Sequence, residues 1–357
     1  MAEPVDVAVV GDGVVGAFVV AALLDAGVPA VRLAWFGDRG GYERRSATRR
    51  SGGLLRCGVA EGPAARLAVE SFTQTWRQHP DRVVSGAVEV VGRDRSALLL
   101  PRVEELAAAG VAGDLVTTDR LRKAIPFAWD DGDVALLEPG GGWAPPHAVR
   151  SRLVRAACRA GVALRDVRPV DAVEHDAPGP VRVRTGAETV RARCVVVAAG
   201  RSTHRLVPSV PGTSRLRRIG YAYYDGLLPP GLPAVNDEAR GLWWRPAPTR
   251  THPARYLVGR AVDAPSDGVT SVGRSVQQDE YVRAGFAALL PDAGRGTYLG
   301  GVTSFDVQSD GHASSTPWHA AADGNVLAVH GLDGGGFKQA PAIARRLAAA
   351  VMKEETS

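Results

Sequence analysis

The sequence predicts an α/β protein in which a second, mostly antiparallel β-sheet is inserted into a doubly wound, mainly parallel sheet. Three observations predict this. A glycine-rich turn near the start joins an apolar run to an apolar helical stretch, two further apolar runs end on glycine (193–200 and 325–331), and strand-forming aromatic stretches lie between them. With 357 residues and 45% hydrophobic content, the chain can bury one large core or two.

The first predicted element is a β-α-β unit. The apolar run 6–10 is typical of a buried parallel strand, and it leads directly into Gly11-x-Gly13-x-x-Gly16. An apolar helix is expected over 18–24, Gly27 can end it in a left-handed conformation, and 31–34 is the expected second strand.

A glycine turn at this place lets the backbone approach a pyrophosphate and points a helix N-terminus at the phosphates. We therefore expect a dinucleotide to contact Gly11, Asp12, Gly13, Val14, Val15 and Gly16. The acidic residue expected at the end of the second strand is replaced by Trp-Phe-Gly, with Asp38 following. Either Asp38 reaches the ribose, or backbone and water hold it. Arg32 and Arg39 would suit a phosphorylated nicotinamide nucleotide, so that alternative stays open at this point.

The domain organisation follows from the positions of these elements. Residues 85–140 and 216–305 have the aromatic and β-branched character of antiparallel strands. We expect a discontinuous nucleotide-binding domain over 1–85, 140–215 and 306–357. The substrate domain is expected over 86–139 and 216–305.

Composition argues against several other classes of protein. The 43 Lys+Arg and 38 Asp+Glu residues leave a net charge of +5, but the basic residues are scattered, so no nucleic-acid partner is expected. The three cysteines, Cys57, Cys158 and Cys194, have no spacing typical of a disulfide framework or a metal site. We recognise no leader and no apolar stretch of membrane-spanning length, and therefore expect a cytoplasmic protein without membrane contact.

Four segments resemble the FAD-dependent D-amino-acid oxidase, sarcosine oxidase and glycine oxidase (DAO) family. Residues 331–343, Gly-Leu-Asp-Gly-Gly-Gly-Phe-Lys-Gln-Ala-Pro-Ala-Ile, resemble the family's flavin-covering motif before a helix. Residues 53–62 resemble the segment in which an arginine precedes a short helix, 142–147 resemble the entry into a later helix, and 197–200 resemble a strand that closes over the flavin. The four matches occur in the family's order across nearly the whole chain.

The resemblance implies a Rossmann-type FAD-binding domain and an inserted substrate domain. It implies FAD contacts, beyond the glycine turn and Asp38, at Ser51, Gly52, Gly53, Leu54, Val170, Ala199, Gly200, Gly334, Gly335, Gly336, Phe337 and Lys338. Some relatives attach flavin through a cysteine, and the matching stretch 302–306 has none, so noncovalent FAD is expected.

The implied reaction is oxidation of a C–N bond in a carboxylate-bearing amine by hydride transfer to flavin, after which water hydrolyses the imine. The expected small-molecule substrate is an N-substituted glycine or related amino acid, including an N-carboxymethyl amine of specialised metabolism. Family members use an arginine and a lysine to hold the carboxylate, and these correspond to Arg56 and Lys338. Lys338 draws notice because lysine otherwise occurs only at 123 and 353.

Other predicted substrate contacts are less distinctive. Tyr221, Tyr223 and Trp243 would form an aromatic wall, although aromatic residues in strands also commonly belong to a core. Where relatives place a lysine that helps oxygen react, this chain offers Arg260 or Ala261, so the electron acceptor is oxygen or another molecule.

Two alternatives remain at this stage. An NAD(P)-dependent dehydrogenase would share the opening glycine turn but would leave the C-terminal glycine motif unexplained. A flavoprotein domain that acts in RNA modification or assembly would use the many arginines to hold nucleic acid.

Overall fold

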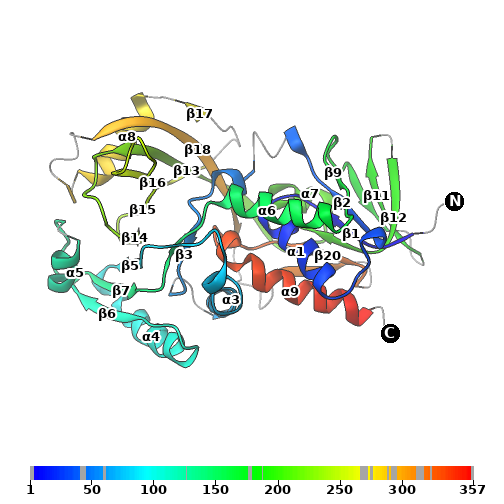
Figure 1. Cartoon of the computed structure of the whole chain (residues 1–357), viewed down its shortest axis with the longest axis horizontal. Helices are drawn as coiled ribbons and strands as arrows, with labels where there is room; N and C mark the ends of the chain where they lie inside the picture. Colours follow the sequence, from blue (N-terminus) through cyan, green and yellow to red (C-terminus); the bar gives the residue numbers. More distant parts are fainter. Residues whose placement is uncertain are drawn as a thin grey trace. The chain divides into compact units, whose positions relative to one another are not determined.

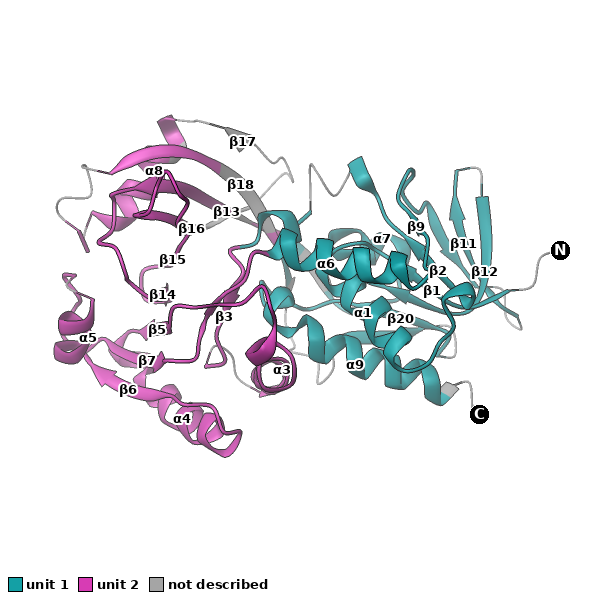
Figure 2. Cartoon of the chain, in the orientation of Figure 1, with its two compact units in different colours: residues 1–51, 146–215, 307–357 teal, residues 52–145, 216–306 magenta. Residues whose placement is uncertain are grey.

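The computed structural model describes residues 4–40, 46–58, 62–125, 127–175, 179–186, 188–265, 272–273, 276–287, 289–290, 296–310, 317–321 and 324–354. The chain forms two compact units, shown in different colours in Figure 2. Unit 1 contains 1–51, 146–215 and 307–357, and unit 2 contains 52–145 and 216–306. Segments 52–85 and 140–145, which we expected in the nucleotide-binding domain, thus fall in unit 2.

Unit 1 contains the predicted β-α-β unit. Its helices are α1 (Val14–Asp25), α6 (Pro146–Arg159), α7 (Thr203–Leu206) and α9 (Gly336–Glu354), with short 3-10 turns at η1 (Ala30–Arg32), η2 (Thr48–Arg50) and η5 (Gly200–Ser202). Its strands are β1 (Val5–Val10), β2 (Leu33–Phe36), β9 (Leu164–Arg165), β10 (Ala172–Glu174), β11 (Val181–Thr185), β12 (Glu188–Val197), β19 (Trp318–Ala321) and β20 (Val326–Val329).

The sheet of unit 1 has the order β10-β11-β12-β1-β2-β9, and β20 pairs with β12 and β19. The pairs β20–β12, β12–β1, β1–β2 and β2–β9 are parallel. The pairs β10–β11, β11–β12 and β19–β20 are antiparallel. Helix α1 packs against both α6 and α9 (Figure 1). The predicted doubly wound sheet is confirmed. The predicted strand over 31–34 begins two residues later, because η1 occupies residues 30–32.

Unit 2 is built mainly from strands. Its helices are α3 (Gly62–Gln74), α4 (Leu99–Ala108), α5 (Thr118–Ala124) and α8 (Val276–Phe286), with 3-10 turns at η3 (Trp76–Gln78) and η4 (Arg93–Leu98). Its strands are β3 (Leu54–Leu55), β4 (Val83–Val84), β5 (Ala87–Val91), β6 (Asp114–Thr117), β7 (Val134–Glu138), β8 (Gly142–Trp143), β14 (Ala234–Asp237), β15 (Leu242–Pro246), β16 (Arg255–Pro265) and β17 (Val272–Gly273). The long strands β13 (Thr213–Asp225) and β18 (Thr297–Asp310) each begin or end in unit 1.

The main sheet of unit 2 has the order β17-β18-β13-β16-β15-β14-β5-β7-β6. It is mostly antiparallel, as predicted, with a parallel pair where β14 meets β5. A small sheet, β3-β8-β4, lies in the same unit.

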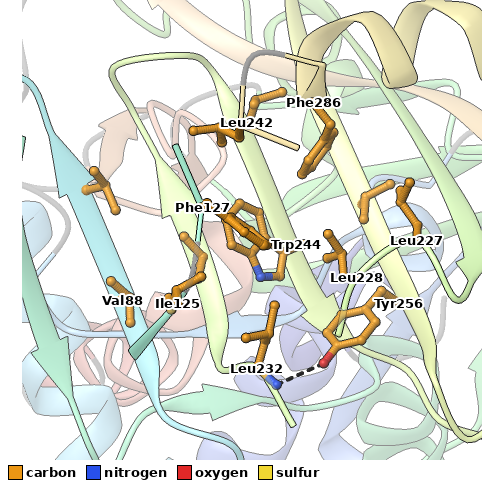
Figure 3. Close-up of a cluster of buried hydrophobic side chains, with 14 of the residues drawn as sticks. Val88, Ile125, Phe127, Leu227, Leu228, Leu232, Leu242, Trp244, Tyr256 and Phe286 are labelled. Carbon is orange, nitrogen blue, oxygen red and sulfur yellow. Dashed lines mark hydrogen bonds between the residues drawn. The ribbon is translucent and has the colours of Figure 1, made fainter. Parts of the chain in front are cut away.

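One face of this sheet packs into the core of unit 2. Trp244 is fully buried at its centre, with its ring 5.5 Å from that of Phe127 and 5.7 Å from that of Phe286, measured between centroids. Figure 3 shows the Tyr256 hydroxyl beside them, where it accepts a hydrogen bond from the Leu232 amide at 2.9 Å. Large aromatic side chains therefore fill this core, and the polar end of Tyr256 is satisfied.

The opposite face carries a different set of side chains, because successive residues of a strand alternate between faces. Across β13, β16 and β15, Tyr221 pairs with Gly259 and Gly259 with Trp243, while Tyr223 pairs with Leu257 and Leu257 with Arg245. We call this surface, consisting of Tyr221, Tyr223, Trp243, Arg245, Leu257 and Gly259, the aromatic face.

The Trp243 indole packs against the backbone of a glycine on each of two sides. A Cβ at Gly259 would lie 2.1 Å from Cε2 of Trp243, and a Cβ at Gly52 would lie 2.8 Å from its Cζ3. The ring therefore lies directly against both backbones, and its position depends on both glycines.

This packing predicts that Gly259→Ala destabilises the protein by about 1–3 kcal/mol, because the new methyl group must displace the indole. Chemical unfolding monitored by tryptophan emission measures the loss. Gly220→Ala on the adjacent strand is the control, since its Cβ would meet Tyr281 at an ordinary 3.6 Å. Equal stability of Gly259→Ala and the native protein would show that Trp243 is not held in this way.

Candidate functional site

The glycine turn joins β1 to α1 in unit 1. Gly11 has φ +118°, and a Cβ there would lie 2.3 Å from the carbonyl oxygen of Ala198, so only glycine fits. Gly13 is the N-cap of α1, and a Cβ there would meet only the Thr48 hydroxyl, at 3.2 Å. The turn is thus tight at Gly11 and open at Gly13.

The N-terminus of α1 has unused hydrogen-bond donors. The Val14 amide donates to the Thr48 hydroxyl at 3.0 Å, and the Ala17 amide donates to the Gly13 carbonyl. Within the described part of the chain, the amides of Val15 and Gly16 have no partner. Unpartnered amides at a helix N-terminus, beside an open glycine, fit the pyrophosphate of a dinucleotide.

Asp12 explains why the second strand lacks its usual acid. Its buried carboxylate accepts a hydrogen bond from Arg150 on α6 at 2.5 Å and one from the Asp38 amide. A Cβ at Gly37 would lie 2.8 Å from Cγ of Asp12, so the Asp12 side chain occupies the space at the end of β2. Burial raises the pKa of Asp12, and Arg150 and the Asp38 amide oppose that rise. The half-exposed Asp38 follows directly.

Other predicted cofactor contacts in unit 1 lie around the sheet. Val170 is buried before β10, and its carbonyl accepts a hydrogen bond from Arg205 at 3.0 Å. Ala199 and Gly200 follow β12, where Gly200 has φ +56° and open space on its Cβ side. Ser51 is the last residue of the first segment of unit 1, while Gly52, Gly53 and Leu54 belong to unit 2.

The C-terminal glycine motif forms the predicted turn before a helix. Gly334 has φ +77°, and the Gly335 amide donates to the carbonyl of Leu332 at 2.5 Å. A Cβ at Gly335 would lie 2.4 Å from the Gln339 side chain. Helix α9 starts at Gly336 and places the buried Phe337 and the half-buried Lys338 in its first turn.

Arg56 lies inside unit 2 near two acidic side chains from adjacent strands. Its guanidinium Nη1 contacts Glu89 of β5, and both side chains are at most 10% exposed. Glu138 of β7 accepts hydrogen bonds from the amides of Cys57, at 2.8 and 3.0 Å, and Gly58, at 2.9 Å. Arg56 therefore already has a carboxylate partner within the protein.

The pKa values of this cluster reflect its burial. Burial lowers the pKa of Arg56 to about 10, against the effect of nearby Glu238 and Glu138. Burial likewise raises the pKa of Glu138, and the two backbone amides oppose that rise. Arg56 still carries its charge at neutral pH.

The structure places the remaining predicted residues on two faces of one sheet. Tyr221, Tyr223 and Trp243 share the aromatic face, where the rings of Tyr221 and Trp243 are 5.9 Å apart between centroids. Arg260 lies on the opposite face, over the ring of Tyr281 on α8, and donates to the Tyr281 carbonyl at 3.3 Å. Arg260 is thus not brought together with the three aromatic residues.

Several residues of these two units escaped sequence reasoning, namely Thr48, Glu89, Glu138, Arg150 and Arg245. Arg245 had a detectable pattern, since Trp-Trp-Arg on a strand puts Trp243 and Arg245 on the same face. Glu89 and Glu138 lie within otherwise apolar strands. A buried acid there needs a hydrogen-bonding or charged partner, but the sequence does not show which residue that partner is. The described residues contain no cluster of His, Cys, Asp or Glu suited to a metal ion. Among the described helices, none has the length and apolar character needed to cross a bilayer.

These features define unit 1 as a dinucleotide-binding fold, and comparison with known families identifies it further. The family model described as FAD dependent oxidoreductase (DAO) matches residues 6–350. The chain therefore belongs to the FAD-dependent oxidoreductase (DAO) family. The predicted family is confirmed, and its members use FAD rather than a nicotinamide nucleotide.

Solved structures show the same fold. A glycine oxidase from Bacillus cereus ATCC 14579 is 17% identical, with a TM-score of 0.74 over 99% of this chain and 96% of that one. An L-proline dehydrogenase from P. horikoshii is 17% identical (TM-score 0.78, 99% and 95% covered), and an iminodiacetate oxidase from Chelativorans sp. BNC1 is 15% identical (TM-score 0.75, 97% and 95% covered). No curated protein sequence matches.

The buried ion pair predicts a distinctive mutational pattern. Arg56→Met leaves Glu89 as an uncompensated buried charge and should lower the free energy of unfolding by about 3–5 kcal/mol. Arg56→Met combined with Glu89→Gln should recover more than half of that loss, because the new side-chain amide is neutral and keeps an acceptor oxygen for Asn236, which donates to Glu89 at 2.8 Å. Urea unfolding measures both.

Arg39→Met is the control, since Arg39 pairs with Asp166 at 3.1 Å but has a side chain 77% exposed. Its loss should stay below about 1 kcal/mol. If Arg56→Met and the double variant lose the same free energy of unfolding, the loss in Arg56→Met does not come from an uncompensated charge on Glu89.

Proposed function

We propose that this FAD-dependent oxidoreductase oxidises the C–N bond of a carboxylate-bearing amine, such as an N-substituted glycine or a related amino acid, to an imine that water then hydrolyses. The open glycine turn with two unpartnered helix amides carries the cofactor part of the proposal. The names of the glycine oxidase and the iminodiacetate oxidase, both with this fold, support the substrate class.

Unit 1 is the proposed FAD-binding domain and unit 2 the proposed substrate domain. When bound, FAD supplies the acceptor for the substrate's hydride. The α1 amides of Val15 and Gly16 would bind its pyrophosphate, and Asp38 its ribose. Binding is proposed to be noncovalent, because 302–306 has no cysteine and Cys57 and Cys194 are buried in the fold.

Lys338 is the proposed charged ligand of the substrate carboxylate from unit 1. It stands in the first turn of α9, where the partial positive charge of the helix N-terminus adds to its own. Fixing the carboxylate orients the C–H bond to be broken. The amine must be neutral, because its lone pair forms the C=N bond as the hydride leaves the carbon. Arg56 remains a predicted second ligand that would share its charge with Glu89.

The wider setting belongs to the same proposal. The substrate is a small amino-acid-like molecule, and electrons leave to oxygen or another acceptor. We propose a cytoplasmic location, in which the three cysteines, all within the described residues and none of them in a disulfide, would stay reduced.

Gly11 and Gly13 predict separable outcomes. Gly13→Ala should fold with less than about 1 kcal/mol lost, because its Cβ meets only Thr48, yet it should lose FAD because the methyl group faces the pyrophosphate. Gly11→Ala should lose the fold itself, since its Cβ would meet the Ala198 carbonyl at 2.3 Å.

The measurements are the visible absorption of the purified protein, which should be yellow, and the FAD that acid or heat releases into solution. A Gly13→Ala protein with full FAD occupancy would contradict the placement of the cofactor, and flavin that stays with the precipitated native protein would contradict noncovalent binding.

Lys338→Met keeps most of the side-chain volume and removes the charge. For an N-alkylglycine we expect kcat/KM to fall roughly tenfold to a hundredfold, because a charge-assisted contact is lost. The same amine without its carboxylate should be a poor substrate that the change hardly affects. FAD occupancy should persist.

Lys353→Met, in the last turn of the same helix, is the matched control and should behave like the native enzyme. Equal losses for the carboxylated and uncarboxylated amines would refute the role of Lys338 in carboxylate binding.

A further inference from the structure

Arg245 is a buried arginine without a carboxylate partner among the residues that the structure describes. It lies on the aromatic face and is 5% exposed. Its Nε donates to the carbonyl of Gly52 and its Nη1 to the carbonyl of Pro246, at 2.5 and 3.0 Å. Its guanidinium carbon lies 4.0 Å from the ring centroid of Trp143. Dipoles and an aromatic ring surround this cation, and no carboxylate of the described residues pairs with it.

Other enclosed arginines of this protein are compensated. Arg56 contacts Glu89, and Arg150 pairs with Asp12 at 2.5 Å. Arg240 pairs with three aspartates, at 2.6 to 2.9 Å. Because burying a charge without a partner is costly, Arg245 differs from these three arginines.

The pKa of Arg245 shows the same imbalance. Burial lowers it to about 10, the hydroxyl groups of Tyr223 and Tyr221 act in the opposite direction, and neighbouring Arg255 lowers it further. The group stays protonated at neutral pH. An anion bound beside it would offset the burial.

A second buried group beside Arg245 also lacks a partner. The indole Nε1 of Trp143, the residue whose ring stacks on the guanidinium, is buried and has no acceptor within the described residues. Tyr223 and Trp143, which both contact the guanidinium, are only partly buried, so solvent reaches part of its immediate surroundings. A buried cation without a carboxylate partner and a buried N–H donor without an acceptor, both judged among the described residues, match the needs of a carboxylate.

We propose that Arg245 binds the substrate carboxylate in unit 2, and that it supplies the guanidinium group expected of Arg56. The proposal rests on the function proposed above. Arg56 contacts Glu89, whereas Arg245 still has N–H donors left after its contacts with two carbonyl groups and its hydrogen bond with the Tyr223 hydroxyl. Tyr221, Tyr223 and Trp243 stand on the same face and would enclose the apolar part of the substrate, so acid recognition and the aromatic wall belong to one site.

The test measures binding without turnover. The probe is an alkylthioacetate, in which sulfur replaces the amine of an N-alkylglycine, so that no C–N bond is present to oxidise. Its dissociation constant for the FAD-loaded enzyme is measured by calorimetry and by the change in flavin absorbance. The corresponding alkylthioacetamide is the uncharged comparison.

Arg245→Met should weaken binding of the thioacetate roughly tenfold to a hundredfold and leave the amide unaffected. Arg283→Met is the matched control, because Arg283 also lies over a tyrosine ring, that of Tyr224 on the other face of the sheet, but pairs with Asp279 at 2.7 Å. It should bind the thioacetate like the native enzyme. Arg245→Lys keeps the charge and loses the planar fork, so an intermediate loss is expected even if Arg245→Met fails to fold.

Native affinity for the thioacetate in Arg245→Lys or Arg245→Met, or an equal loss for the uncharged amide, would overturn the proposal. Failure of the native enzyme to bind the thioacetate would overturn it as well. If the native enzyme binds the thioacetate through Arg245 but N-alkylglycines do not reduce its flavin, the proposed reaction is wrong and the anion site is supported.

Discussion

The close approach between the turn after β1 and the end of β12 is the constraint on which unit 1 depends. Two glycines make it possible, because a Cβ at Gly11 would meet Ala198 and a Cβ at Gly16 would lie 2.0 Å from the Gly11 carbonyl. The Ala198 amide in turn donates to the Val10 carbonyl at 2.8 Å. This contact places the N-terminus of α1 at the carboxyl ends of parallel strands, where ligands of such sheets bind.

The same constraint decides how the neighbouring polar groups are used. The Gly11 carbonyl accepts a hydrogen bond from the Trp35 indole at 3.0 Å, so the tryptophan that stands near the expected acid supports the turn from the second strand. Asp12 then fills the space beside Gly37 and is neutralised by Arg150. An acid at the end of β2 would compete for this space and add a second negative charge to it. The departure from the usual pattern is therefore a rearrangement within one turn, and Asp38 is the next carboxylate along the chain.

Sequence patterns predicted what depends on local chemistry. The β-α-β unit and the left-handed Gly27 were predictable, since turn geometry and apolar periodicity are local properties. The helix after the C-terminal glycines was predicted from the resemblance to the family motif. The strand expected at 31–34 is found at 33–36, because apolar residues alone do not distinguish a 3-10 turn from the start of a strand. The pairing of Arg56 with Glu89, 33 residues later along the chain, could not be predicted, since it depends on the packing of β5 beside the segment after β3.

A sequence motif does not show whether a buried arginine has a carboxylate partner within the protein. The arginine at position 56 has the family's place in the sequence, yet Glu89 already neutralises it, while Arg245 has no place in any motif and no carboxylate partner in the described structure. An arginine with an internal carboxylate partner interacts more weakly with a bound anion, because the partner already offsets the cost of burying the guanidinium charge. An arginine without one gains the full interaction when an anion arrives. At 15–17% identity to solved relatives, the fold is retained while the partners of individual side chains can change. The residue that recognises a charged substrate is therefore better sought by asking which buried charge lacks a partner than by its position in an alignment.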